Sequence, residues 1–189
     1  MGEQNLYHVQ VGDVIKEYPE GTPYCKIAED FQGGYDNDIV LAYVNGKLQE
    51  LHKVLCGDCT MSFETTAGNV GHMAYKRSMS LLLVKAIYDV EGHRNIKKVR
   101  IHFSVSKGYY CTVKGAAKVD QEFLGRVESR MHRMIDQDMP IGKRTVHTDD
   151  AVALFRQYGM YDKERLFEYR RVSRVNLYNI NDFEDYFYG

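Results

Sequence analysis

The stretch Ile39-Val40-Leu41-Ala42-Tyr43-Val44-Asn45-Gly46 decides the fold of the first part of the chain. Its first six residues are all apolar, a run that is typical of a buried strand. Asn45-Gly46 then gives the strongest short hairpin signal in the sequence, because both central residues of such a turn need a positive φ. We therefore expect residues 39–44 to form a strand that turns back at Asn45 and Gly46.

The segments around this strand predict a small β-rich unit. Residues 6–11 and 14–18 read as two strands joined by the turn signal Gly12-Asp13. Thr22 and Pro23 are predicted to be the N-cap and the first residue of a helix that ends near Phe31, before two glycines. A last strand at residues 60–65 follows a tight turn.

The second part of the chain begins after Gly68 and Gly71, where the charge balance changes sign. Residues 1–65 contain four Lys and Arg against eleven Asp and Glu, whereas residues 66–118 contain ten against two. Such a step indicates a domain boundary or a segment with an anionic partner. Two domains with different solvated faces explain it equally well.

Periodic patterns predict the elements of this second part. Apolar residues recur at helical spacing over residues 72–90, and Gly92 ends that helix. Residues 99–105 alternate as a half-buried strand and turn back into residues 109–113. Asp120 and Thr148 are predicted to cap two more helices, the second closed by Gly159. The inward stripe of the first of these is predicted to be Phe123, Val127, Met131 and Met134 or Ile135.

The segment from Tyr178 onward is crowded with aromatic and acidic residues. Such a cluster at the end of a soluble chain usually needs further chain to cover it. The sequence therefore predicts that more chain follows in the parent protein.

The composition, 44% hydrophobic and 27% charged, is ordinary for a globular protein. No window approaches 18 consecutive apolar residues, so no membrane helix is predicted. The polar, acidic first residues do not resemble a signal peptide. We therefore expect a cytoplasmic protein without a membrane partner, whose four cysteines are not a disulfide framework.

Motifs for catalysis and for metal binding are missing. Gly142-Lys143-Arg144-Thr145 lacks the leading glycine of a P-loop and the Ser or Thr after its lysine, and GxGxxG, HExxH and GxSxG do not occur. His52, Cys56 and Cys59 form an HxxxCxxC pattern that is one zinc ligand short unless Cys25 folds back. Small residues in a tight turn explain that pattern better, so no catalytic residue and no metal site are predicted.

Cys111 on a strand near His102 raises the question of a thiol nucleophile. Such chemistry needs a thiolate of low pKa in contact with a base, and the sequence shows no sign of that arrangement. A buried strand cysteine is the preferred interpretation.

Ten cationic residues between positions 76 and 118 form a basic group. With Tyr109 and Tyr110 nearby, this group has the composition of an RNA-contact face, although a solvated face explains it as well. RNA is therefore kept as a candidate partner. The ten are Lys76, Arg77, Lys85, Arg94, Lys97, Lys98, Arg100, Lys107, Lys114 and Lys118.

The order of the first elements, with Val44-Asn45-Gly46-Lys47-Leu48 before the last strand, resembles the TGS domain, a β-grasp module found in threonyl-tRNA synthetases. Residues 77–87 resemble the helix that opens the second additional domain of threonyl-tRNA synthetase, which edits mischarged tRNA. Lys107-Gly108-Tyr109-Tyr110 resembles its hairpin, and residues 127–132 its next helix. The resemblance implies an α+β fold, with a TGS-like domain at residues 1–67 and a synthetase editing-domain-like region at residues 68–189.

The editing residues of that family are replaced in this chain. The resemblance places the two histidines of an HxxxH motif at Arg77 and Leu81, and the cysteine and glycine of a later CxGxH motif at Phe187 and Gly189. Arginine and leucine cannot replace a pair of imidazoles that hold water or metal. Deacylation by the family's mechanism is therefore not expected.

The altered motifs and residues 176–189 together resemble a group of bacterial uridine kinase-like proteins, which join these two domains to a C-terminal P-loop nucleoside kinase. The resemblance implies a non-catalytic regulatory or ligand-binding region of such a kinase. Its partners would be a small-molecule ligand or the kinase domain. ATP and Mg are expected only for that absent domain, and no cofactor is expected in this chain.

A ligand site is predicted near Arg77, Ser78, His102 and Tyr110, where the arginine suits a phosphate or a carboxylate. Two alternative functions remain open. One is an aminoacyl-tRNA deacylase, and the other is a tRNA-binding module related to threonyl-tRNA synthetase.

Overall fold

The computed structural model describes residues 5–106, 108–115, 118–169 and 171–186. The chain divides into two units, Met1–Lys76 and Arg77–Gly189. The division lies inside the helix α2 (Asn69–Glu91), and the predicted boundary between residues 67 and 68 lies just before that helix. Lys107, Phe187 and Gly189, which the sequence patterns included, lie outside the described residues.

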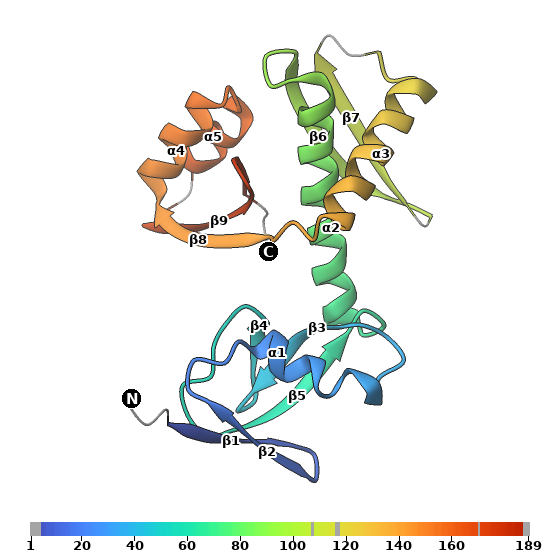
Figure 1. Cartoon of the computed structure of the whole chain (residues 1–189). Coiled ribbons are helices and arrows are strands. Elements are labelled where there is room, and N and C mark those ends of the chain that lie inside the picture. The colour runs from blue at the N-terminus through green and yellow to red at the C-terminus, as the bar shows by residue number, and fades with distance from the viewer. Residues whose placement is uncertain (1–4, 107, 116–117, 170, 187–189) are drawn as a thin grey trace. The chain divides into compact units, whose positions relative to one another are not determined.

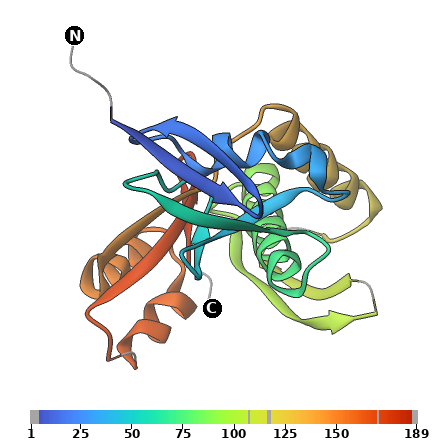
Figure 2. The ribbon, with the colours of Figure 1, turned by 90° about the horizontal axis from the view of Figure 1, so that it is seen from below.

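Five strands form one mixed sheet in the first unit, in the order β2-β1-β5-β3-β4 (Figure 1). β5 lies between two antiparallel hairpins, β1–β2 and β3–β4. It pairs in parallel with β1 and antiparallel with β3. Figure 2 shows the β1–β2 hairpin in dark blue. This is the strand order of a β-grasp fold, as expected. The strands are β1 (Leu6–Val11), β2 (Val14–Pro19), β3 (Ile39–Val44), β4 (Lys47–Glu50) and β5 (Cys59–Thr65).

The predicted turn at Asn45 and Gly46 is confirmed, with φ values of 50° and 76°. Both residues lie in the left-handed region, which Asn and Gly adopt at the least cost. The Asn45 side chain also accepts a hydrogen bond of 2.9 Å from the backbone N–H of Thr60. That bond ties the turn to β5 and helps to fix the register of the sheet.

A short helix, α1 (Tyr24–Glu29), and a 3₁₀ turn, η1 (Gln32–Gly34), follow the first hairpin. Ile27 of α1 is fully buried with Val9 and Ala42 of the sheet, so the helix and the sheet share one core. The predicted cap at Thr22 is wrong. Pro23 occupies the N-cap position, and the Thr22 hydroxyl instead donates to the carbonyl of Pro19 in the turn after β2.

Tyr18 leads to a prediction for the first unit. Its side chain is buried and donates a 2.8 Å hydrogen bond to Asp30, and burial, followed by that carboxylate, raises the pKa of Tyr18 well above its usual value. In the unfolded chain a tyrosine ionises near pH 10. The stability that neutral Tyr18 contributes is therefore complete below about pH 10 and is lost as the pH rises further.

We expect Tyr18→Phe to cost about 1 kcal/mol at pH 7, because one hydrogen bond is lost. We also expect the variant to lose less stability than the parent protein between pH 9 and 11. Urea unfolding at each pH, followed by circular dichroism, measures both effects. If the two proteins lost the same stability between pH 9 and 11, Tyr18 would not be the group responsible for the loss.

The second unit begins with α2, a hairpin and a second helix (Figure 1). The elements are β6 (Ile96–Val105), β7 (Gly108–Gly115) and α3 (Gln121–Asp136). The Asp120 cap is confirmed, because its carboxylate accepts the backbone N–H of Phe123 at 3.0 Å. Of the two residues left open for the inward stripe, Met134 is buried, whereas Ile135 is 53% exposed.

A three-stranded antiparallel sheet and two helices complete the second unit. The strands are β8 (Gly142–His147), β9 (Arg174–Ile180) and β10 (Phe183–Asp185), and the helices are α4 (Thr148–Gln157) and α5 (Tyr161–Glu168). The predicted cap at Thr148 is wrong, because His147 occupies the N-cap position and the Thr148 hydroxyl donates to the carbonyl of Val172. The segment just before β9 therefore binds the hydroxyl that was expected to cap α4.

The segment after Tyr178 is part of this core as far as the described residues reach, and the expectation that further chain follows stays a prediction. Ile180 and Phe183 are almost completely buried, packed with residues of α2, α3 and α4. Strand pairing between β8 and β9 brings the segment there. Within the described part of the chain, no helix combines the length and the apolar character needed to cross a membrane.

Candidate functional site

The β6–β7 hairpin has one apolar face and one polar face. Val99 lies opposite Val113 and Ile101 opposite Cys111, and the apolar residues Val99, Ile101 and Val113 pack against the core of the second unit. Successive residues of a strand point to opposite faces, so the intervening pairs point away from that core. These pairs are Lys98 with Lys114 and Arg100 with Thr112.

A bulge shapes the outer part of this polar face. The pairing passes from Ile101 with Cys111 to Ser104 with Tyr109, so that two residues of β6 stand opposite Tyr110 alone. Such a bulge re-aims side chains. In a regular strand the neighbouring side chains of His102 and Phe103 would point to opposite faces. The bulge explains why both contact the ring of Tyr110.

We call His102, Phe103 and Tyr110 the aromatic cluster. The centroid of the Tyr110 ring lies 5.2 Å from that of His102 and 5.5 Å from that of Phe103. The His102 Nε2 atom lies 2.8 Å from the hydroxyl of Thr112, which orients the imidazole. Phe103 is 61% exposed and Tyr110 is 50% exposed. The prediction of a half-buried strand therefore fails at Phe103, because the bulge interrupts the alternation.

The charge of the hairpin has a single sign. Strands β6 and β7 contain four cationic residues, Lys97, Lys98, Arg100 and Lys114, and no Asp or Glu. We call the set Lys98, Arg100, Thr112, Lys114 and the aromatic cluster the hairpin face. It offers exposed rings beside positive charge, an arrangement suited to flat, anionic ligands.

The structure brings two of the four predicted ligand residues together, His102 and Tyr110. Arg77 and Ser78 lie on α2, the first exposed and the second half-buried, and their part in a ligand site stays a prediction. Leu81, the position that the resemblance matches to a second histidine, is 2% exposed in the core. An apolar core position of this kind cannot hold a water or a metal ion.

Cys59 and Cys111 have the environment of structural thiols. Burial raises the pKa of both Cys59 and Cys111, so these thiols are less ionised than an exposed cysteine. His102 contacts Thr112 rather than Cys111. Among the described residues, no group of three His, Cys, Asp or Glu side chains is arranged to hold a metal ion.

One set of residues was missed by the sequence reasoning. Arg126, Arg130 and Arg133 follow one another along α3 and line a groove beside the end of α2. Their spacing of four and three residues places them on one helix face, a signal that the sequence contains. The apolar stripe of α3, which was predicted, lies on the other side of the helix.

No protein-family model matches the chain. Its sequence is similar to threonine–tRNA ligases. It is 29% identical to that of Syntrophotalea carbinolica over 175 residues, covering 90% of this chain and 27% of the ligase. It is 27% identical to that of Thermotoga maritima and 23% to that of Acetivibrio thermocellus, each over 172 residues and 90% of this chain.

The similarity to threonine–tRNA ligases extends through nearly the whole chain, so the predicted resemblance to threonyl-tRNA synthetase is confirmed in both units. The chain spans about a quarter of the length of these ligases, 27%, 26% and 27% in the three cases. All three are ligases, and the further resemblance to uridine kinase-like proteins stays a prediction.

Proposed function

We propose that the chain is an RNA-binding module related to the N-terminal region of threonyl-tRNA synthetase, and that the hairpin face binds the RNA. One observation carries the proposal. Three exposed rings lie together on a hairpin whose strands contain four cationic residues and no carboxylate. Proteins that bind single-stranded RNA stack its bases on aromatic side chains and contact its phosphates with lysine and arginine.

Each part of the hairpin face has a separate role in this proposal. Unpaired bases stack on Tyr110 and Phe103, while His102 is held in place by Thr112. Arg100 and Lys114 contact phosphates, which gives affinity without sequence preference. Because the relatives are named as ligases of tRNA, we propose an unpaired segment of tRNA as the natural ligand.

Editing of that tRNA is not part of the proposal. The exposed Arg77 and the buried Leu81 replace the histidine pair that the family resemblance requires. We expect the isolated chain to release no amino acid from mischarged threonine tRNA above the uncatalysed rate. A deacylation assay with seryl-tRNA measures this, and release by the chain at a catalytic rate would establish the deacylase reading instead.

Fluorescence anisotropy with labelled single-stranded RNA tests the binding proposal. We expect Tyr110→Ala to weaken the affinity about tenfold, because stacking of one base on an aromatic ring contributes roughly 1–3 kcal/mol. Tyr161→Ala, which removes a ring that is 60% exposed on α5, is the matched control and should leave the affinity unchanged. Equal affinities for the two variants would overturn the stacking role.

The salt dependence separates the phosphate contacts from the stacking. We expect log Kd to rise linearly with log salt concentration, and Arg100→Gln to lower that slope by about one. Arg165→Gln, at an exposed arginine of α5, is the control. A slope that is the same for Arg100→Gln and for the parent protein would remove Arg100 from the interface.

The aromatic cluster also supports a second candidate function, the one favoured by the uridine kinase-like resemblance. The base of a free nucleotide can stack on the Tyr110 ring as a base of RNA does, in a regulatory region whose ATP and Mg belong to a separate kinase domain. Arg77 and Ser78 are the residues predicted to contact its phosphate. Thermal-shift measurements with nucleosides and nucleotides discriminate, since a ligand of the folded state raises Tm. A shift with nucleotide but no RNA affinity would favour this candidate.

A further inference from the structure

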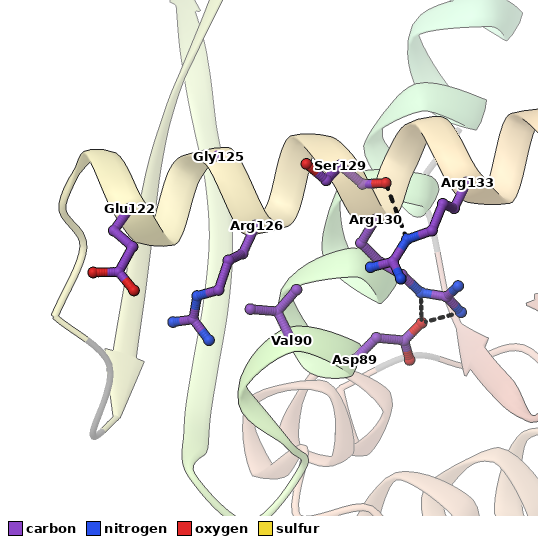
Figure 3. A pocket seen from close by; sticks show the side chains of 8 residues that line it. All are labelled: Asp89, Val90, Glu122, Gly125, Arg126, Ser129, Arg130 and Arg133. Carbon is purple, nitrogen blue, oxygen red and sulfur yellow. Dashed lines mark hydrogen bonds and ion pairs between the residues drawn. The ribbon is translucent and has the colours of Figure 1, made fainter.

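A groove of about 570 Å³ lies between the end of α2 and one side of α3 (Figure 3). The first part of its lining comes from α2 and the rest from α3, so it lies wholly within the second unit. The groove does not include any residue of the hairpin face. Its lining residues are Asp89, Val90, Glu122, Gly125, Arg126, Ser129, Arg130 and Arg133.

The three arginines of the groove differ in how firmly they are held. Arg130 donates from Nε and Nη2 to one carboxylate oxygen of Asp89, at 2.8 Å in each case, so its charge is largely neutralised. Arg126 lies 3.7 Å from the Glu91 carboxylate, and Arg133 donates a hydrogen bond of 3.4 Å to the carbonyl of Ser129. Arg126 and Arg133 are both exposed, on either side of the fixed Arg130.

Gly125 supplies an independent observation. It lies inside α3, where glycine is a poor helix former, and its φ is not positive. A Cβ added at Gly125 would meet no atom within 4 Å. The fold therefore does not require glycine here, but its missing side chain leaves the helix backbone open at the floor of the groove. A ligand can approach the helix backbone more closely at a glycine than at a residue with a side chain.

We propose that this groove binds a phosphate group. The phosphate lies over the turn of α3 between Gly125 and Ser129, where Arg126 and Arg133 donate to its oxygens and the Ser129 hydroxyl can add a third donor. Arginine suits this role because its planar guanidinium forms paired hydrogen bonds with phosphate. Asp89 holds Arg130 in the wall of the groove. The negative charge of Glu122 repels an anion from its end of the groove.

The phosphate could come from a free polyphosphate or from the backbone of an RNA, and the test separates the two. The probe is inorganic tripolyphosphate, titrated by calorimetry into the full chain. We expect Arg133→Gln to weaken its binding about tenfold, whereas Arg165→Gln on α5 should have no effect.

Gly125→Leu is the sharper variant, because a Cβ at this position meets no atom within 4 Å and the substitution replaces a poor helix former by a good one. The leucine side chain then occupies space that the phosphate would need. We expect it to abolish tripolyphosphate binding while Tm stays equal or rises. If tripolyphosphate does not bind, or binds Gly125→Leu as well as it binds the parent protein, the proposal is wrong.

A parallel titration with single-stranded RNA identifies the source of the phosphate. A weaker RNA affinity in Gly125→Leu would make the groove part of an RNA-binding surface, whereas an unchanged RNA affinity, with tripolyphosphate binding lost, would make it a site for a free polyphosphate. The result does not depend on the hairpin face, since Tyr110→Ala leaves the groove intact.

Discussion

Replacing Phe183 by alanine is expected to lower the free energy of unfolding of the second unit by about 3–5 kcal/mol. The side chain is 1% exposed, so its loss leaves a cavity as well as removing buried apolar surface. Its ring lies 5.6 Å from that of Tyr88 on α2, and the Lys85 ammonium lies 5.9 Å from the ring centre. The substitution therefore removes contacts that join the end of the described chain to its first long helix.

Amide hydrogen exchange followed by mass spectrometry measures the effect in each unit separately. Protection should fall in α2 and β9 and should stay unchanged in the five-stranded sheet of the first unit. Tyr169→Ala, at a side chain that is 86% exposed, is the control and should change protection by less than about 0.5 kcal/mol. A similarly small effect for Phe183→Ala would mean that Phe183 does not belong to the core.

Lys163→Met is expected to lower the free energy of unfolding of the second unit by about 3 kcal/mol. Asp185 is 1% exposed, and its carboxylate pairs with the Lys163 ammonium and accepts the backbone N–H of Tyr186 at 2.6 Å. Removing the ammonium leaves a buried carboxylate without its counter-charge, which is far more costly than losing an exposed ion pair.

The double variant Lys163→Met with Asp185→Leu separates this effect from a loss of packing. Two apolar residues in place of a buried ion pair are often tolerated, so we expect the double variant to be more stable than Lys163→Met alone. Urea unfolding of the parent protein and the three variants, including Asp185→Leu, completes the cycle. A double variant that is less stable than both single variants would show that the carboxylate is not the source of the cost.

The elements that the sequence predicted well are those specified by neighbouring residues. The turn at Asn45-Gly46 and the cap at Asp120 each depend on a few adjacent residues, and both are found. The sheet β8-β9-β10 was missed because β8 pairs with β9, about thirty residues away. Long-range pairing of this kind leaves little local signal, so the burial of Ile180 and Phe183 between distant elements could not be predicted.

The same distinction applies to the candidate sites. His102 and Tyr110 could be placed together from the sequence because they lie on the two strands of one hairpin. The contact of Phe103 with Tyr110 could not be predicted, because it depends on a bulge for which the sequence contains no turn signal. The arginine groove needs the end of α2 beside the outer face of α3, and that arrangement follows from packing and not from a motif.

The place of Phe183 and Ile180 in the core has a consequence for the order in which the chain folds during synthesis. The first unit is closed by β5, which ends at Thr65, so its sheet can form while the remainder is still on the ribosome. The second unit is completed only by β9 and β10, and until they emerge the parts of its core that pack with Ile180 and Phe183 stay exposed. A nascent chain in that state is a natural client for chaperones, and a pause in translation shortly before Arg174 would be the moment of greatest risk of aggregation.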